Sequence, residues 1–102
     1  MEAAMYGTIA GMKVKPGALE SLKRMEERHP QGFIATYAYR MDSNPDELWL
    51  AVLFEDEVSY RANANSPEQD HEYRDLRSHL REDPEWHDGE VVFEEVRKKM
   101  PY

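Results

Sequence analysis

The pattern of apolar and polar residues changes its period along the chain, and each change marks a new element. Residues 5–14 and 32–41 alternate every second position, which is typical of strands that lie on a core. Between them, apolar residues recur every third position at Leu19, Leu22 and Met25, which predicts an amphipathic helix over 18–28. Gly7 and Gly11 share one face of the first strand and favour a helix packed closely over it, with a ligand there as the alternative.

A second helix is predicted in two parts. Asp56 is the expected N-cap of a segment that runs to Asn65, and Ser66 is the expected N-cap of the next. Pro67 suits the first helical position, and Gln69 completes a capping box with Ser66. The chain therefore breaks the helix at Asn65-Ser66 and restarts it. The buried stripe of the second part is formed by Tyr73, Leu76 and Leu80.

Two further strands complete the pattern. The turn-forming residues 42–46 join the second strand to a third at 47–55, so these two strands form a hairpin. Asp83-Pro84 ends the second helix, residues 85–89 read as a turn, and residues 90–97 read as the last strand.

The order β-α-β-β-α-β predicts a ferredoxin-like α+β fold with a four-stranded antiparallel sheet. We expect one domain over residues 1–102, with its core at about 5–97. The apolar run Leu48–Phe54 indicates a strand that is covered on both faces, yet the helices cover only one. We therefore expect a homodimer through the open sheet face.

Composition excludes several classes of function. The chain holds 13 Lys+Arg against 21 Asp+Glu, a formal charge of −8, which disfavours nucleic acid and anionic membrane surfaces as partners. It has no cysteine, so thiolate nucleophiles and Cys-based metal sites are excluded. The longest apolar run is too short to span a membrane, and the N-terminal residues lack a secretory pattern. A cytoplasmic location is the expectation.

Three segments and the order of elements give the chain a family resemblance. These segments are KVKPG (Lys13–Gly17), LFED (Leu53–Asp56) and NSPEQDHEY (Asn65–Tyr73). With these features, residues 5–97 resemble the antibiotic-biosynthesis-monooxygenase family of dimeric α+β barrels. The resemblance implies a homodimer whose sheets pack face to face, with a pocket in each protomer between the sheet and the helices. Several members of this family oxygenate aromatic polyketides or quinols without a metal or flavin, so no cofactor is expected.

The haem-degrading branch of the same family is disfavoured. That branch uses an Asn on the first strand, and a Trp and a His on the second helix. Thr8, Asn63 and Tyr73 stand near these positions, and none of them matches.

His71 is the candidate catalytic residue, as an imidazole that takes a proton from the substrate. With Asp75 and His79 it forms one stripe at i, i+4 and i+8. The two ends of this stripe lie about 12 Å apart at 1.5 Å per residue, so the three side chains cannot share one metal ion. No metal site is predicted, and a solvated polar face is the alternative interpretation.

Aromatic residues supply the candidate substrate-binding site. Phe33, Tyr37 and Tyr39 share one face of the second strand, with Trp49 on the neighbouring strand. Tyr60 and Tyr73 lie on the helix that is expected above them. Aromatic walls with polar tips suit a flat aromatic ligand, although ordinary packing explains the same residues. The predicted substrate-binding set is Tyr37, Tyr39, Trp49, Tyr60 and Tyr73.

The leading functional hypothesis is a cofactor-independent monooxygenase that acts on a phenolic or quinol-type aromatic molecule. The alternatives are a non-enzymatic dimeric domain that binds a small aromatic or apolar molecule, and a structural domain whose pocket is filled by its own side chains. A shared fold does not choose between these functions.

Overall fold

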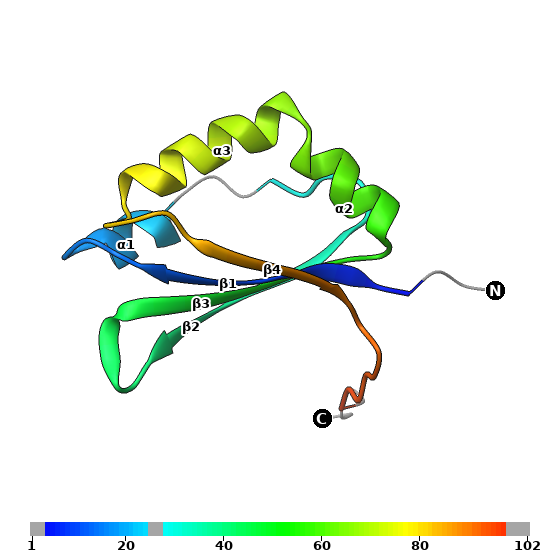
Figure 1. Ribbon diagram of the computed structural model, residues 1–102, viewed down its shortest axis with the longest axis horizontal. Helices are drawn as coiled ribbons and strands as arrows, with labels where there is room; N and C mark the ends of the chain where they lie inside the picture. Colours follow the sequence, from blue (N-terminus) through cyan, green and yellow to red (C-terminus); the bar gives the residue numbers. More distant parts are fainter. Residues whose placement is uncertain (1–3, 25–27, 98–102) are drawn as a thin grey trace, which may run out of the picture.

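The computed structural model describes residues 4–24 and 28–97. Their elements follow the predicted order, with the second helix divided in two (Figure 1). In chain order they are β1 (Tyr6–Lys13), α1 (Ala18–Lys23), β2 (Phe33–Met41), β3 (Asn44–Phe54), α2 (Glu57–Ala64), α3 (Pro67–Ser78) and β4 (Glu85–Glu90).

The four strands form one antiparallel sheet in the order β2-β3-β1-β4, which confirms the ferredoxin-like α+β arrangement. Helices α2 and α3 lie above one face of the sheet, whereas the described residues place no helix on the opposite face (Figure 1). We call these the helix face and the open face. Because side chains alternate along a strand, β3 divides its apolar run between both faces. Leu48, Leu50, Val52 and Phe54 lie on the helix face, and Trp49, Ala51 and Leu53 lie on the open face.

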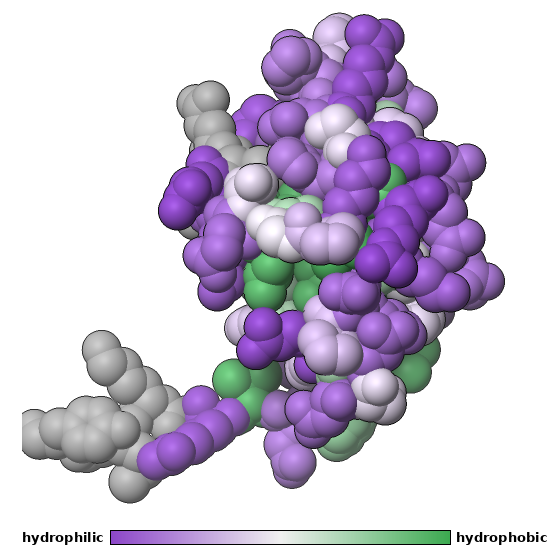
Figure 2. Space-filling model, turned by 90° about the vertical axis from the view of Figure 1, so that its left-hand side faces the viewer, coloured by the Kyte–Doolittle hydropathy of each residue, from purple (hydrophilic) through white to green (hydrophobic). Residues whose placement is uncertain are grey.

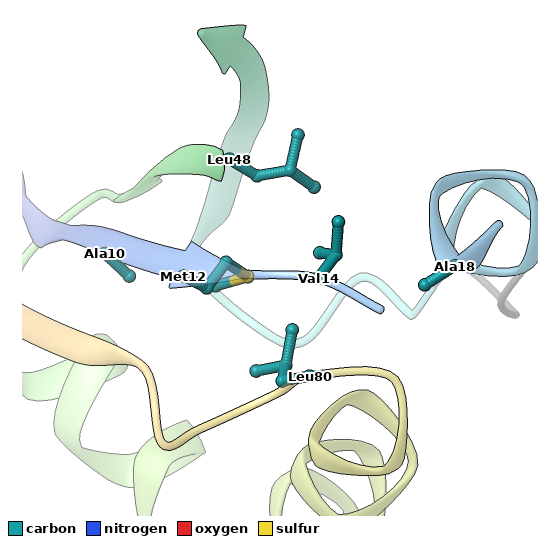
Figure 3. Close-up of a cluster of buried hydrophobic side chains, with 6 residues drawn as sticks. All are labelled: Ala10, Met12, Val14, Ala18, Leu48 and Leu80. Atoms are coloured by element: carbon teal, nitrogen blue, oxygen red, sulfur yellow. The ribbon is translucent and has the colours of Figure 1, made fainter. Parts of the chain in front are cut away.

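The buried core sits at one end of the helix face (Figure 3). It joins the end of β1, the first residue of α1 and the segment after α3. An isolated bridge between Val14 and Leu80 ties this segment to the end of β1. The core consists of Ala10, Met12, Val14, Ala18, Leu48 and Leu80.

Both predicted N-caps of the divided helix are confirmed. The Asp56 carboxylate accepts a hydrogen bond from Ser59 N at 2.8 Å, and the Ser66 hydroxyl accepts one from Gln69 N at 3.1 Å. Each cap satisfies a backbone N–H that the first turn of a helix leaves without a partner. The break at Asn65-Ser66 therefore follows from local side-chain chemistry.

Two element boundaries differ from the prediction. Helix α1 ends at Lys23 with Arg24 as its C-cap, and Arg28 is not helical; residues 25–27 of the predicted helix lie outside the described residues. The hairpin turn is also tighter than residues 42–46, because Met41 already pairs with Asn44. Only Asp42 and Ser43 turn the chain, as in a two-residue β-hairpin.

The predicted position of the last strand is wrong. Residues 85–89, which read as a turn, form β4 together with Glu90 and pair with β1. Residues 91–97 belong to no strand, and they extend away from the rest of the molecule (Figures 1 and 2). The prediction rested on their apolar alternation. β1 pairs with β3 along one edge and with β4 along the other, so no edge of β1 is left for residues 91–97. Val92, Phe93 and Val96 remain 87%, 78% and 71% exposed.

The expectation that a helix packs over Gly7 and Gly11 is also wrong, because both glycines lie on the open face. The Trp49 indole lies across Gly11, where a Cβ atom would approach its ring to 2.8 Å. At Gly7, a Cβ atom would overlap the Val52 carbonyl oxygen of the neighbouring strand. Close contact with β3, and not with a helix, requires glycine at these positions.

Within the part of the chain that the structure describes, no helix is long and apolar enough to cross a membrane.

Candidate functional site

A cavity of about 800 Å³ lies between the helix face of the sheet and the helices. Neither α2 nor α3 has a fully buried residue, because their inner sides line this cavity. Apolar side chains lie at the bottom of a recess between more hydrophilic ones (Figure 2). The apolar lining includes Met12, Leu19, Leu22, Leu48, Leu50, Val52, Phe54 and Leu76. This composition suits an apolar ligand.

Tyr60, Asp88 and Thr8 form a polar end of the cavity. The Tyr60 hydroxyl donates to Asp88 Oδ1 at 2.8 Å, and Arg61 Nη1 donates to Asp88 Oδ2 at 3.1 Å. Thr8 of β1 is the direct register partner of Asp88 on β4, and α2 brings Tyr60 above them. Three elements that are distant in the sequence therefore place their polar groups together in the cavity wall.

The environment of the polar end sets two protonation states. Burial raises the pKa of Tyr60 to about 12, and the hydrogen bond to Asp88 acts in the same direction. Burial alone would raise the pKa of Asp88, but hydrogen bonds from Tyr60 and Arg61 outweigh it and hold that pKa below its usual value. At neutral pH, Tyr60 is therefore a neutral hydroxyl and Asp88 is a carboxylate.

Thr8 is the unusual member of this group. Its side chain is buried, with the residue only 6% exposed, and its Oγ1 atom makes no hydrogen bond within the described residues. The hydroxyl lies near enough to lower the pKa of both Tyr60 and Asp88, although it meets hydrogen-bond geometry with neither. A buried polar group without a partner destabilises the folded protein, so its presence in a cavity wall calls for an explanation.

A second polar cluster fixes the junction of α2 and α3 over the cavity. Arg28 donates from Nε and Nη2 to Glu72 Oε2 at 3.2 and 3.0 Å, and Nη2 also donates to Asn63 Oδ1 at 2.7 Å. The Asn63 amide donates in turn to Gln69 Oε1 at 3.1 Å. Because all four residues line the cavity, the cluster both shapes it and holds the segment after α1 against the helices.

The predicted substrate-binding residues divide between the two faces of the sheet. Tyr60 and Tyr73 line the cavity, and the Tyr73 ring lies 6.4 Å from that of Trp86, which also lines it. Tyr37 and Tyr39 lie on the open face, paired with Ala51 and Trp49 of β3.

The five aromatic residues therefore do not line one pocket, because the sheet separates the two groups. The cause is a register shift after Phe33: Phe33 pairs with Phe54, and Ala35 already pairs with Leu53. This irregularity places Phe33 in the cavity wall and Tyr37 on the opposite face. Trp49 is held on the open face as well, where its Nε1 donates to Glu47 Oε2 at 2.8 Å.

His71 lies on α3 as an exposed residue and is not among the described residues that line the cavity. His79, on the same stripe, is the C-cap residue of α3, and its Nε2 atom lies 4.0 Å from Asp75 Oδ1. The catalytic role of His71 stays a prediction.

Sequence reasoning missed Asp88, Thr8 and Arg28 as parts of the site. Asp88 was hidden because its segment reads as a turn, so its register against Thr8 could not be inferred. The resemblance did point to the right region: Thr8, Asn63 and Tyr73, the positions compared with the haem-degrading branch, all line the cavity.

The sheet and its helices place this chain among small ferredoxin-like α+β proteins. The chain is similar in fold to solved structures at 17–21% sequence identity. A "putative antibiotic biosynthesis monooxygenase" from Chloroflexus aurantiacus is 21% identical with a TM-score of 0.71, covering 91% of this chain and 98% of that one. One of the same description from Nitrosomonas europaea is 17% identical with a TM-score of 0.72, covering 91% and 95%.

A third structure of this description, from Bordetella bronchiseptica, is 18% identical with a TM-score of 0.70 and covers 88% of this chain and 99% of that one. No protein-family model and no curated protein matches the sequence. The similarity in structure confirms the resemblance at the level of the fold. Function must be argued from the site.

Proposed function

We propose that this protein is a cofactor-independent monooxygenase whose substrate is a phenolic or quinol-type aromatic molecule bound in the cavity. The observation that carries the proposal is the cavity of about 800 Å³, with an extended apolar lining and an end at which a neutral hydroxyl meets a carboxylate. An apolar wall favours the ring, and the polar end orients its oxygen. The fold shared with proteins described as monooxygenases agrees with this proposal.

The chemistry balances without a redox group from the protein. A quinol loses a proton from oxygen, and the electron-rich ring carbon that results reduces dioxygen and bonds to it. Loss of water then leaves a hydroxyquinone, so that quinol and dioxygen give hydroxyquinone and water. The protein contributes an apolar environment and a fixed orientation, which bring the reacting atoms together.

We further propose that the protein works as a homodimer through the open face. Ile9, Tyr37 and Tyr39 are 55%, 63% and 59% exposed on that face, and grouped apolar residues on a surface are typical of an interaction site. Val92 and Phe93 add exposed apolar side chains on a segment that finds no partner strand among the described residues. A second copy of the chain would cover both.

Binding without turnover is the alternative function, and one observation favours it. The described residues that line the cavity include no histidine, and Asp88, with its lowered pKa, is a weak proton acceptor. A general base works best when its pKa lies near the operating pH. In this alternative, the dimer binds a small aromatic molecule and leaves it unchanged.

Oxygen uptake separates the two functions. Protein freed of metal by chelation is mixed with a panel of quinols and phenols in an oxygen electrode, with each compound's spontaneous oxidation subtracted. The proposal predicts uptake with one dioxygen consumed per product. Leu50→Trp, which fills the cavity, abolishes the uptake, whereas Val58→Trp on the exposed side of α2 retains it. Binding of the panel with no uptake above the spontaneous rate would instead support the binding function.

A further inference from the structure

We propose that Thr8, Tyr60 and Asp88 form a subsite that recognises one neutral hydroxyl group on an aromatic ligand. This inference deepens the proposed function and rests on it, because it requires an aromatic molecule in the cavity. It goes further in naming the group that is recognised and the atoms that recognise it. It also assigns a role to the buried threonine, which the fold alone leaves unexplained.

The first argument is the Thr8 hydroxyl. It is buried in the cavity wall, and no described residue accepts its proton. Val has nearly the same size, so packing alone gives no reason for a hydroxyl at this position. A ligand oxygen that accepts from Thr8 Oγ1 satisfies the group.

The second argument is the unused acceptor capacity of Asp88. Its Oδ1 accepts from Tyr60 and its Oδ2 accepts from Arg61, but a carboxylate offers about four lone-pair positions. The Tyr60 hydroxyl already donates its hydrogen bond to Asp88, so toward a ligand it offers only its oxygen as an acceptor. The subsite thus presents one free donor, Thr8, beside several acceptors.

This arrangement matches the two sides of a hydroxyl group. A phenolic O–H donates to the Asp88 carboxylate, while its oxygen accepts from Thr8. A methyl group can do neither, and a ligand carboxylate would place a negative charge beside Asp88. The Tyr73 and Trp86 rings, 6.4 Å apart in the cavity wall, leave aromatic surface for the rest of the ligand.

The test uses three probes that differ at one substituent: 2-naphthol, 2-methylnaphthalene and 2-naphthoate. Their dissociation constants are measured by equilibrium dialysis at neutral pH, where the naphthol is uncharged. We expect the wild-type protein to bind 2-naphthol about tenfold more tightly than 2-methylnaphthalene, the factor given by one well-placed hydrogen bond. We expect 2-naphthoate to bind more weakly than both.

Two threonine variants locate the effect. Thr8→Val should reduce the preference for 2-naphthol, because only the hydrogen bond to Asp88 remains, and it should leave the affinity for 2-methylnaphthalene unchanged, which also shows that the variant folds. Thr36→Val is the matched control, because Thr36 lines the same cavity from β2, and it should keep the preference. Asp88→Asn should remove the discrimination against 2-naphthoate.

The outcomes separate this inference from the proposed function. Equal binding of 2-naphthol and 2-methylnaphthalene by the wild-type protein, or a preference that Thr8→Val leaves undiminished, would overturn the subsite and leave the aromatic-binding cavity standing. If none of the three probes binds, the cavity proposal and the subsite both fail.

Discussion

The Tyr60 hydroxyl donates a hydrogen bond of 2.8 Å to Asp88, and this bond joins helix α2 to strand β4 across the end of the cavity. It closes one side of the space between the helix layer and the sheet. Together with burial, the same bond raises the pKa of Tyr60, and it lowers the pKa of Asp88. One interaction thus contributes to the shape of the cavity and to its charge.

Alkaline pH tests the state of Tyr60. Its pKa in the folded protein is raised from 10.0 to about 12, so the unfolded chain loses this proton first as the pH rises. The contribution of Tyr60 is fully present below pH 10 and is lost between pH 10 and about 12, where stability falls. In Tyr60→Phe this part of the fall should be absent. Urea unfolding of the wild-type protein and of Tyr60→Phe at pH 9 and pH 11.5 measures it.

The Arg28–Glu72 pair should contribute to stability as well as to the shape of the site. The side chains are only 28% and 32% exposed, and Arg28 also donates to Asn63. Arg28→Met leaves Glu72 without its cation, and we expect a loss of about 2 kcal/mol in the free energy of unfolding. Glu72→Gln alone should cost less, and a double-mutant cycle in urea gives the coupling. Additive effects of the two changes would contradict a direct interaction.

Glycine positions on neighbouring strands should differ sharply in tolerance. A Cβ atom at Gly7 would overlap the Val52 carbonyl of β3, whereas one at its register partner Gly89 meets nothing within 4 Å. We expect Gly7→Ala to lower the free energy of unfolding by about 3 kcal/mol. Gly89→Ala should change it by less than about 0.5 kcal/mol. Similar losses from both would mean that strand propensity, and not the contact with β3, decides these positions.

The proposed dimer is tested by two charged substitutions. Ile9 is 55% exposed on the open face, and Val58 is 78% exposed on the helix layer. Native mass spectrometry should find the wild-type protein at twice 12.0 kDa. Ile9→Glu should give a monomer, because it places a charge in the interface, and Val58→Glu should leave the dimer intact. A wild-type protein that stays monomeric at micromolar concentrations would contradict the open-face interface.

The features that could be predicted from the sequence are those that local chemistry determines. Asp56 and Ser66 cap their helices through side chains that reach a backbone N–H three residues away, so the break in the second helix is readable from a few positions. The continuous apolar run Leu48–Phe54 likewise indicated a strand with apolar side chains on both faces. These signals do not depend on the rest of the fold.

The features that could not be predicted depend on distant partners. β4 is mostly polar and becomes a strand only through its pairing with β1, so the register of Asp88 against Thr8 has no local signal. The register shift after Phe33 reverses the face of Tyr37 and Tyr39, and alternation alone assumes a regular strand. The candidate site was therefore found only in part, through Tyr60 and Tyr73.

The central claim is that an aromatic ligand binds in the cavity on the helix face, and methyl NMR spectra with 2-naphthol test it most directly. Strand β3 supplies its own control, since Leu50 and Val52 line the cavity while Leu53 lies on the open face with Ile9. We predict that 2-naphthol shifts the methyl signals of Leu50 and Val52 and leaves those of Leu53 and Ile9 in place. Shifts confined to Leu53 and Ile9 would place the ligand on the open face and contradict the account.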